Sequence, residues 1–152
     1  MGATKKKVFS YPYPRPSLTV DIALVTRDAK PRVLLIRRKA DPFRGKWALP
    51  GGFVDENERL LDAARRELQE ETGVTDSDLE QLHTFGDPGR DPRGWTVSVA
   101  FVALVSPEQL KPVAGDDAAE VGWFPLGDLP PLAFDHADIL ARVRHRLADR
   151  AG

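Results

Sequence analysis

One stretch of the sequence gathers acidic side chains at helical spacing. The charged residues that form the pattern are Glu58, Arg66, Glu67, Glu70 and Glu71, and the flanking glycines are Gly52 and Gly73. The intervening residues are mostly good helix formers, the segment 55–58 resembles a capping box, and Gly73 can supply the left-handed residue that ends a helix. The sequence therefore predicts a helix from this box to Thr72, with its last three glutamates on an arc beside the apolar stripe.

Three carboxylates on one arc of a helix are unfavourable without a counter-charge. Glu67 and Glu71 form a like-charge pair at i,i+4, which costs about 0.2–0.5 kcal/mol, and they lie near the negative end of the helix dipole. Arg66 can offset part of this cost by pairing with Glu70. A divalent cation would relieve the rest, and hard oxygen ligands suit Mg²⁺ or Mn²⁺. The alternative is a solvated acidic helix face.

The segment from Gly52 to Val74, GFVDENERLLDAARRELQEETGV, resembles the complete signature of the Nudix hydrolases, G-x5-E-x7-R-E-U-x-E-E-x-G-U with U apolar. A chance match at a given start position is on the order of 10⁻⁹. The resemblance implies metal-dependent cleavage of a diphosphate joined to a second moiety. It also implies that the carbonyl of Gly51 and the carboxylates of Glu67, Glu70 and Glu71 hold Mg²⁺, with Mn²⁺ as a substitute.

A further carboxylate is expected to complete the site as a general base or metal ligand. In related enzymes this acid comes from a loop or strand after the signature, so the candidates are Glu120, Asp116 and Asp117. Glu70 and Glu120 are our predicted catalytic residues. The alternative is that the two aspartates are turn residues and that Glu120 is an edge-strand charge.

Four flanking segments resemble the ADP-ribose pyrophosphatase branch of the family, namely YPRPSLTVD, VLLIRRKADPFRGKWALPGGF, FGDPGRDPRG and LAFDH. The resemblance implies hydrolysis of ADP-ribose to AMP and ribose 5-phosphate. Arg90 and Arg93 carry guanidinium groups suited to phosphate or ribose-phosphate recognition. The alternative for this loop is a solvated turn with a local Arg–Asp pair.

Two further substrate-binding residues are predicted before the acidic helix. Successive strand residues point to opposite faces, so one of Arg37 and Arg38 faces the pocket, and the resemblance favours Arg38. Phe53 is a candidate for the apolar slot that adenine needs, although aromatic side chains are more often core residues. The other aromatic candidates are Tyr11, Tyr13 and Trp95.

Two other functions stay open. One is a Nudix hydrolase acting on nucleoside triphosphates, dinucleotides or nucleotide sugars. The other is a non-catalytic ADP-ribose sensor, because the flanking patterns also occur in transcription regulators that bind ADP-ribose. The intact glutamates argue against a pure sensor, which could lose them freely. Those regulators carry an added C-terminal DNA-binding domain, and this chain ends one helix after its predicted sheet, so no nucleic-acid partner is expected.

The composition is that of one globular domain. The chain has 152 residues, of which 41% are hydrophobic and 30% charged. Its net charge of −1 gives no reason to expect a nucleic-acid or membrane partner. The absence of cysteine excludes disulfides, thiolate metal sites and cysteine nucleophiles. With no secretory signal or membrane span in the sequence, we expect a cytoplasmic enzyme for a small nucleotide substrate.

Apolar and β-branched segments predict strands around the acidic helix. The expected strands cover 18–26, 32–37, 47–52, 79–85, 95–105 and 121–124, and a last helix covers 135 to about 147. Helices on two sides of a mixed sheet predict an α/β/α sandwich, which the Nudix resemblance also implies. Residues 17–150 would form this single domain. The proline-rich arm at 1–16 would be extended and would cross onto a second subunit in a homodimer.

Overall fold

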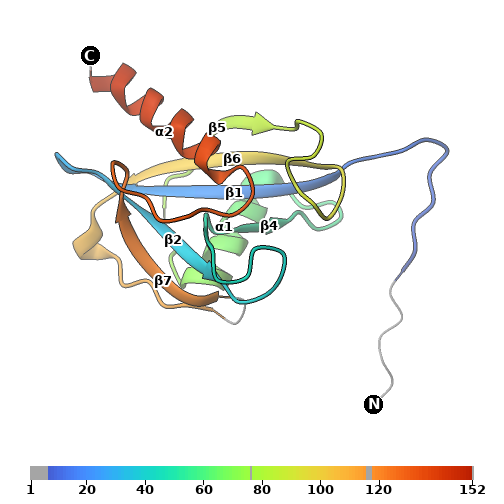
Figure 1. Cartoon of the computed structure of the whole chain (residues 1–152), viewed down its shortest axis with the longest axis horizontal. Helices are drawn as coiled ribbons and strands as arrows, with labels where there is room; N and C mark the ends of the chain where they lie inside the picture. Colours follow the sequence, from blue (N-terminus) through green and yellow to red (C-terminus); the bar gives the residue numbers. More distant parts are fainter. Residues whose placement is uncertain (1–6, 76, 116–117, 152) are drawn as a thin grey trace.

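The computed structural model describes residues 7–75, 77–115 and 118–151. Its elements, labelled in Figure 1, are β1 (Ser17–Thr26), β2 (Arg32–Arg38), β3 (Trp47–Ala48), β4 (Gly51–Phe53), α1 (Leu60–Thr72), β5 (Glu80–Phe85), β6 (Thr96–Val105), a 3-10 turn η1 (Pro107–Gln109), β7 (Ala118–Pro125) and α2 (His136–Ala151). Every predicted strand and both predicted helices are present.

The strands form one mixed sheet of seven strands. Its main order is β3-β2-β1-β6-β5, with β4 paired to β1 and β7 paired to β2. The long central strands β1 and β6 run parallel, in register from Ser17 opposite Thr96 to Thr26 opposite Val105. The other strand pairs are antiparallel. The predicted mixed central sheet is therefore confirmed.

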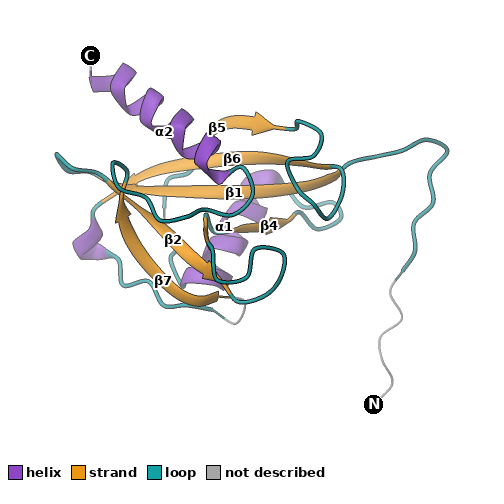
Figure 2. Ribbon diagram, viewed as in Figure 1, coloured by secondary structure: helices purple, strands orange, loops and turns teal. Residues whose placement is uncertain are grey.

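Alternation along β1 divides the core into two layers. Val20, Ile22 and Leu24 pack with residues of α1, among them Leu68. Ala23 and Val25 point the other way and pack with the α2 residues Ile139, Leu140 and Val143. Full burial of such a side chain stabilises the fold by about 1.5–3 kcal/mol. The two helices thus cover opposite faces of the sheet (Figure 2), which confirms the predicted α/β/α sandwich.

The helix α1 begins later than its capping signal predicts. Glu58 does reach back, because its Oε1 accepts a hydrogen bond from the Asp55 amide at 3.0 Å. Asn57, however, has a φ of 61°, in the left-handed region, so this box closes a separate turn. The N-cap of α1 is Arg59, which makes no side-chain capping bond. The prediction of a helix starting at the box was wrong, whereas the predicted end at Thr72 and Gly73 is confirmed.

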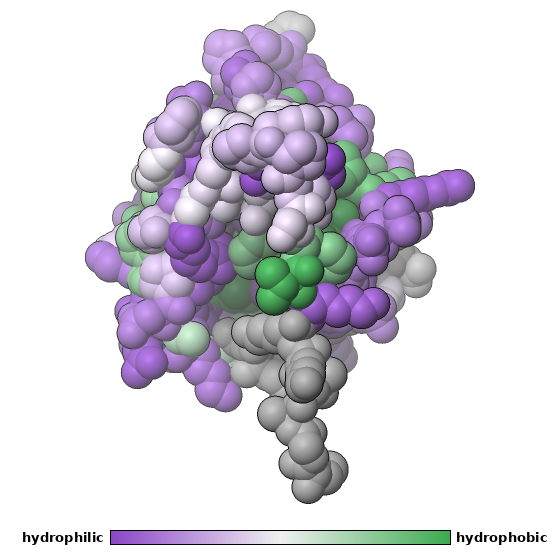
Figure 3. All heavy atoms as spheres, turned by 90° about the vertical axis from the view of Figure 1, so that its right-hand side faces the viewer, coloured by the Kyte–Doolittle hydropathy of each residue, from purple (hydrophilic) through white to green (hydrophobic). Residues whose placement is uncertain are grey.

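The described part of the N-terminal arm extends away from the sheet (Figure 1). Val8 is 89% exposed and Tyr13 is 63% exposed. The Arg15 guanidinium lies 4.0 Å from the Tyr11 ring centroid, so the arm's ring contacts are internal to it. Figure 3 shows hydrophobic surface on the face that carries the arm. Neither helix, within the described ranges, is long and apolar enough to cross a membrane.

Candidate active site

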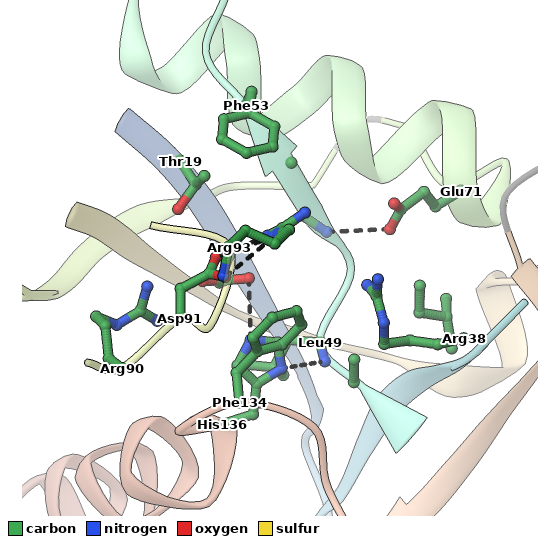
Figure 4. Close-up of a pocket in the computed structure, with 15 residues that line it drawn as sticks. Thr19, Arg38, Leu49, Phe53, Glu71, Arg90, Asp91, Arg93, Phe134 and His136 are labelled. Carbon is green, nitrogen blue, oxygen red and sulfur yellow. Dashed lines mark hydrogen bonds and ion pairs between the residues drawn. The ribbon is translucent and has the colours of Figure 1, made fainter. Parts of the chain in front are cut away.

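The acidic wall of the site is the face of α1 that meets the β4 turn. The Glu71 Oε2 accepts a hydrogen bond from the Gly51 amide at 3.0 Å, and Figure 4 shows this carboxylate directed at the turn. Beside it, a Cβ added to Gly52 would stand 2.5 Å from the carboxylate of Glu67. A side chain at 52 would displace this carboxylate, so glycine at 52 lets Glu67 lie directly against the backbone of the turn.

One arginine links the carboxylates of this wall. The Arg66 guanidinium bonds Glu58 at 2.8 Å, Glu67 at 2.8 Å and Glu70 at 3.3 Å, and it also donates to the Phe53 carbonyl at 3.0 Å. Its hydrogen bonds lower the pKa of Glu58 to about 2. Burial raises the pKa of Glu67, and repulsion from Glu70 acts in the same direction. Glu67 is therefore less stable in its charged form than it would be in water, although it bonds Arg66.

The donor chemistry of this wall fits a divalent cation. Among the described residues, no three His, Cys, Asp or Glu side chains converge on a preformed cation position. Glu67 and Glu71 nevertheless stand one helical turn apart and line the same cleft as Gly51. A cation held there would stabilise the charged form of Glu67, which burial and repulsion from Glu70 disfavour. Glu70 does not line this cleft and has 58% of its side chain exposed.

Arg38, at the end of β2, faces the acidic wall across the cleft. It lines the cleft together with Glu67 and Glu71, and its Nε donates to the Pro42 carbonyl at 2.7 Å. Burial lowers the pKa of Arg38, and the charge of Arg93 lowers it further. Arg38 makes no ion pair within the described residues. It is therefore a half-buried cation positioned to receive an anion.

Arg37 and Arg38 point to opposite sides of β2, as strand alternation predicts. The Arg37 guanidinium points out of the cleft and bonds Glu120 at 3.0 Å. Glu120 lies on β7 with 56% of its side chain exposed, and it does not line the cleft. The structure therefore does not bring Glu120 to Glu67 and Glu71. The other two candidates, Asp116 and Asp117, lie outside the described residues.

Both predicted arginines of the 87–94 loop line the inner pocket, and each has its own carboxylate. The Arg90 side chain is 5% exposed and binds Asp135 through two hydrogen bonds of 2.8 and 2.6 Å. Arg93 pairs at 2.8 Å with Asp91, whose side chain is 2% exposed. Arg93 thus makes the local Arg–Asp pair that was the alternative for this loop, while it also borders the pocket.

Two phenylalanines flank the Arg93 guanidinium in the pocket. Its central carbon lies 5.0 Å from the Phe53 ring and 5.2 Å from the Phe134 ring. Phe134 also stacks on Arg38 at 5.0 Å and has a φ of 52°. Sequence reasoning missed Phe134, although it belongs to the LAFDH segment that carried part of the resemblance. Its left-handed backbone turns the ring into the pocket, and no local pattern announces that conformation.

A second missed feature is a buried polar cluster beneath the turn. It consists of Asp21 on β1, Ser98 on β6 and His136 at the start of α2, which are 7%, 0% and 4% exposed. Burial acts to raise the pKa of Asp21, but contacts with His136, Ser98 and Arg90 together hold it below its usual value. His136 stands at the start of α2, and Asp21 carried no signal in the sequence.

The comparison that decides the family is a match of the NUDIX domain model to residues 16–143. The chain belongs to the Nudix family. It is 44% identical to the ADP-ribose pyrophosphatase of Methanocaldococcus jannaschii, over 84% of this chain and 73% of that protein. It is 38% identical to the ADPR responsive transcriptional repressor NtrR of Acinetobacter baylyi, over 91% of this chain and 57% of the repressor.

A solved Nudix structure shows the same fold with a ligand. It is the NUDIX domain of Shewanella oneidensis NrtR complexed with ADP ribose, with a TM-score of 0.82 and 40% identity, covering 91% of this chain and 94% of that chain. The predicted family, fold and enzyme class, a Nudix pyrophosphatase, are thereby confirmed. Enzymes of this class generally use divalent metal ions, which agrees with the chemistry of the acidic wall.

Proposed function

We propose that this Nudix protein hydrolyses ADP-ribose to AMP and ribose 5-phosphate, using Mg²⁺ with Mn²⁺ as a substitute. The observation that carries the proposal is one cleft of about 470 Å³ with Glu67 and Glu71 on one wall and Arg38 on the other. This volume lies in the usual range for small-molecule sites. The identity to an ADP-ribose pyrophosphatase and the fold shared with an ADP-ribose complex support this substrate.

The chemistry follows from the charge of a diphosphate. Its oxygens repel an attacking water, so the site must neutralise them. Arg38 offers a planar set of N–H donors that suits phosphate oxygens, and a bound phosphate would replace the solvation that its burial removes. A divalent cation, when bound, neutralises further diphosphate charge and favours formation of the nucleophile from water. Glu67, Glu71 and the Gly51 carbonyl are the groups that would hold it.

A carboxylate at the edge of this cluster would remove the proton from the attacking water. We propose Glu70 for this role, because it stands between Glu67 and Glu71 in sequence and remains accessible to water. Glu120 is the second candidate, but its ion pair with Arg37 must open before it can turn to the cleft. A general base must reach the proton directly or through one water, so substrate binding decides between the two.

The adenosine end is assigned to the aromatic side of the pocket. Phe53 and Phe134 border the same pocket as Arg93, and aromatic faces separated by a planar guanidinium can also receive a flat base. Arg90 would hold the 87–94 loop in place and not contact the substrate itself, since its guanidinium already makes two hydrogen bonds to Asp135. These assignments extend the predicted substrate residues Arg38, Phe53, Arg90 and Arg93 by one, Phe134.

A substrate panel tests the proposed function. ADP-ribose, a nucleoside triphosphate, a dinucleotide and a nucleotide sugar would each be incubated with the protein and Mg²⁺, and the products separated by chromatography. We expect AMP and ribose 5-phosphate from ADP-ribose at the highest kcat/KM of the panel. Rapid cleavage of another diphosphate with no cleavage of ADP-ribose would reject this substrate and keep the enzyme class.

The sensor hypothesis has one specific observation in its favour, the 38% identity to an ADP-ribose-responsive repressor. A sensor predicts tight ADP-ribose binding with no turnover in Mg²⁺ or Mn²⁺. The complete set of glutamates favours the enzyme, because a pure binding site has no use for a costly acidic cluster.

A homodimer is also proposed. The described part of the arm presents exposed Val8, Phe9 and Tyr13 and extends away from the sheet in Figure 1. Burial of this apolar surface against a second copy would supply a driving force for association. Sedimentation equilibrium should give twice the chain mass, and a single-chain mass at micromolar concentration would contradict it. The domain limits, the cytoplasmic location and the absence of a nucleic-acid partner stay predictions from the sequence.

A further inference from the structure

His136 connects the buried polar cluster to the backbone of the site. Its Nδ1 accepts a hydrogen bond from the Leu49 amide at 3.0 Å, and its Nε2 lies 3.3 Å from the Asp21 Oδ1. The other oxygen of Asp21 accepts a hydrogen bond from the Ser98 hydroxyl at 2.5 Å. Figure 4 shows the imidazole beneath the strand that leads into the turn, with both of its contacts drawn.

The two contacts fix the tautomer of His136. Because Nδ1 accepts a hydrogen bond from the Leu49 amide, the ring proton of the imidazole stands on Nε2. That proton is donated to Asp21, which is held ionised by its partners. A ring with one acceptor and one donor, each satisfied, has a single orientation in this buried position.

Besides the pairing of β4 with β1, three hydrogen bonds hold the Leu49–Gly51 segment, and the first is the bond from the Leu49 amide to His136. The Pro50 carbonyl accepts a hydrogen bond from the Ile22 amide at 2.8 Å. The Gly51 amide donates to Glu71 at 3.0 Å. Gly51 also lies directly on β1, since an added Cβ would stand 2.2 Å from the Val20 carbonyl oxygen. The turn is therefore held between β1 and α1, and His136 supplies the only one of these three bonds that comes from α2.

We propose that His136 is a positioning residue that acts through the Leu49 amide. By holding this amide it sets the position of Gly51, whose N–H bonds Glu71 and whose carbonyl is an expected cation ligand. The kinetic part of this inference rests on the proposed hydrolase function. His136 is not a catalytic residue here, because both of its ring nitrogens are occupied by protein partners.

Two substitutions at His136 distinguish its contact with the Leu49 amide from its contact with Asp21. In His136→Asn the amide oxygen stands near the position of Nδ1 and can accept from Leu49, but the side chain is too short to reach Asp21. In His136→Gln the amide nitrogen stands near the position of Nε2 and can donate to Asp21, but Leu49 loses its acceptor. A matched control is His145→Gln, in the same helix, because His145 has 74% of its side chain exposed.

The experiment measures backbone amide hydrogen exchange at Leu49 and Gly51 by NMR, together with kcat and KM for ADP-ribose. We expect His136→Gln to lose protection at both amides and to lower kcat by about 10- to 100-fold with a smaller change in KM. His136→Asn should keep the Leu49 protection and recover most of kcat. The reverse order of the two variants, or parent-like kcat in both, would overturn the proposal.

The exchange readout is independent of the substrate. If the parent protein does not cleave ADP-ribose, the proposed function fails, while exchange at Leu49 still decides whether His136 holds this amide. If His136→Gln does not fold, Ser98→Ala takes its place. That variant weakens the support of Asp21 but leaves the bond from Leu49 to His136, so we expect reduced stability with Leu49 still protected. Loss of that protection in Ser98→Ala would assign the positioning role to Asp21 and overturn the proposal for His136.

Discussion

The two walls of the cleft balance their charges differently. On the acidic wall one cation, Arg66, forms ion pairs with four carboxylates, those of Asp55, Glu58, Glu67 and Glu70. The basic wall carries Arg38 and Arg93, and the neighbouring Arg90 lines the inner pocket. Arg90 and Arg93 each have a carboxylate of their own, Asp135 and Asp91. The acidic wall therefore has a surplus of negative charge, whereas this pair of arginines is neutralised and serves mainly to build the loop.

The exception on the basic wall is Arg38. Burial lowers its pKa and raises the pKa of Glu67, so on each wall one group is less stable in its charged form than it would be in water. A divalent cation would stabilise the charged form of Glu67 on the acidic wall, and a phosphate would stabilise that of Arg38 on the basic wall. A metal-bound diphosphate supplies both at once, which is why the two walls are expected to act on one ligand while making different contributions to kcat and KM.

Removal of divalent ions should have the largest effect, since it leaves the acidic wall without its counter-charge. Excess chelator should abolish ADP-ribose hydrolysis, and Mg²⁺ or Mn²⁺ should restore it. The measurement is product formation by chromatography before and after the metal is returned. Undiminished turnover in excess chelator would mean that the acidic wall has no catalytic cation.

Glu71→Gln should have the next largest effect. The variant keeps the shape and an oxygen that can accept from the Gly51 amide, but it removes a ligand charge. We expect kcat to fall by about 10²-fold or more, with the free energy of unfolding close to that of the parent. Glu56→Gln, at an exposed position in the preceding turn, is the control. Near-normal kcat in Glu71→Gln would show that another acid holds the cation.

Arg38→Ala should change binding more than chemistry. The loss of a charge-assisted hydrogen bond of about 1.5–3 kcal/mol raises the KM for ADP-ribose by about 10- to 100-fold. Arg37→Ala is the matched control, because its neighbouring guanidinium pairs with Glu120 outside the cleft and an exposed pair contributes about 0–1 kcal/mol. Equal KM values in the two variants would remove Arg38 from the substrate site.

Glu58→Gln should have the smallest effect, a change in how the free energy of unfolding depends on pH. The folded-state pKa of Glu58 is about 2 against an ordinary value of 4.5, so its ionised form stabilises the fold above pH 4.5 and this contribution is lost as the pH falls toward 2. Urea unfolding of parent and variant should differ at neutral pH and converge in acid. A difference that does not change with pH would contradict the pairing of Glu58 with Arg66.

The acidic wall was predictable because its residues are contiguous in the sequence. Helical periodicity alone places Glu67 and Glu71 on one arc, and the signature adds the glycine at 52 against which Glu67 packs. Only the start of the helix was wrong, since the left-handed Asn57 separates the capping box from α1. The two-layer core was likewise predictable, because alternation in β1 assigns its side chains to opposite faces.

The basic wall was predictable only where a local rule applied. Strand alternation separates Arg37 from Arg38, and the Asp91–Arg93 pair spans two positions. The Arg90–Asp135 pair spans 45 positions, and the cluster of Asp21 and His136 joins β1 to α2. Such contacts depend on how α2 returns to the sheet, which no spacing within one segment encodes. The place of Phe134 in the pocket depends on the same packing of α2, since Phe134 lies just before that helix.

The most direct test of the division between the walls is calorimetric titration of ADP-ribose into Glu71→Gln in the presence of Mg²⁺, because hydrolysis of the ligand is slowed in this variant. We predict that this variant binds ADP-ribose with a Kd near the KM of the parent, and that adding Arg38→Ala weakens the Kd by about 10- to 100-fold. No binding to Glu71→Gln, or equal binding with and without Arg38, would contradict the assignment of catalysis to the acidic wall and of substrate binding to the basic wall.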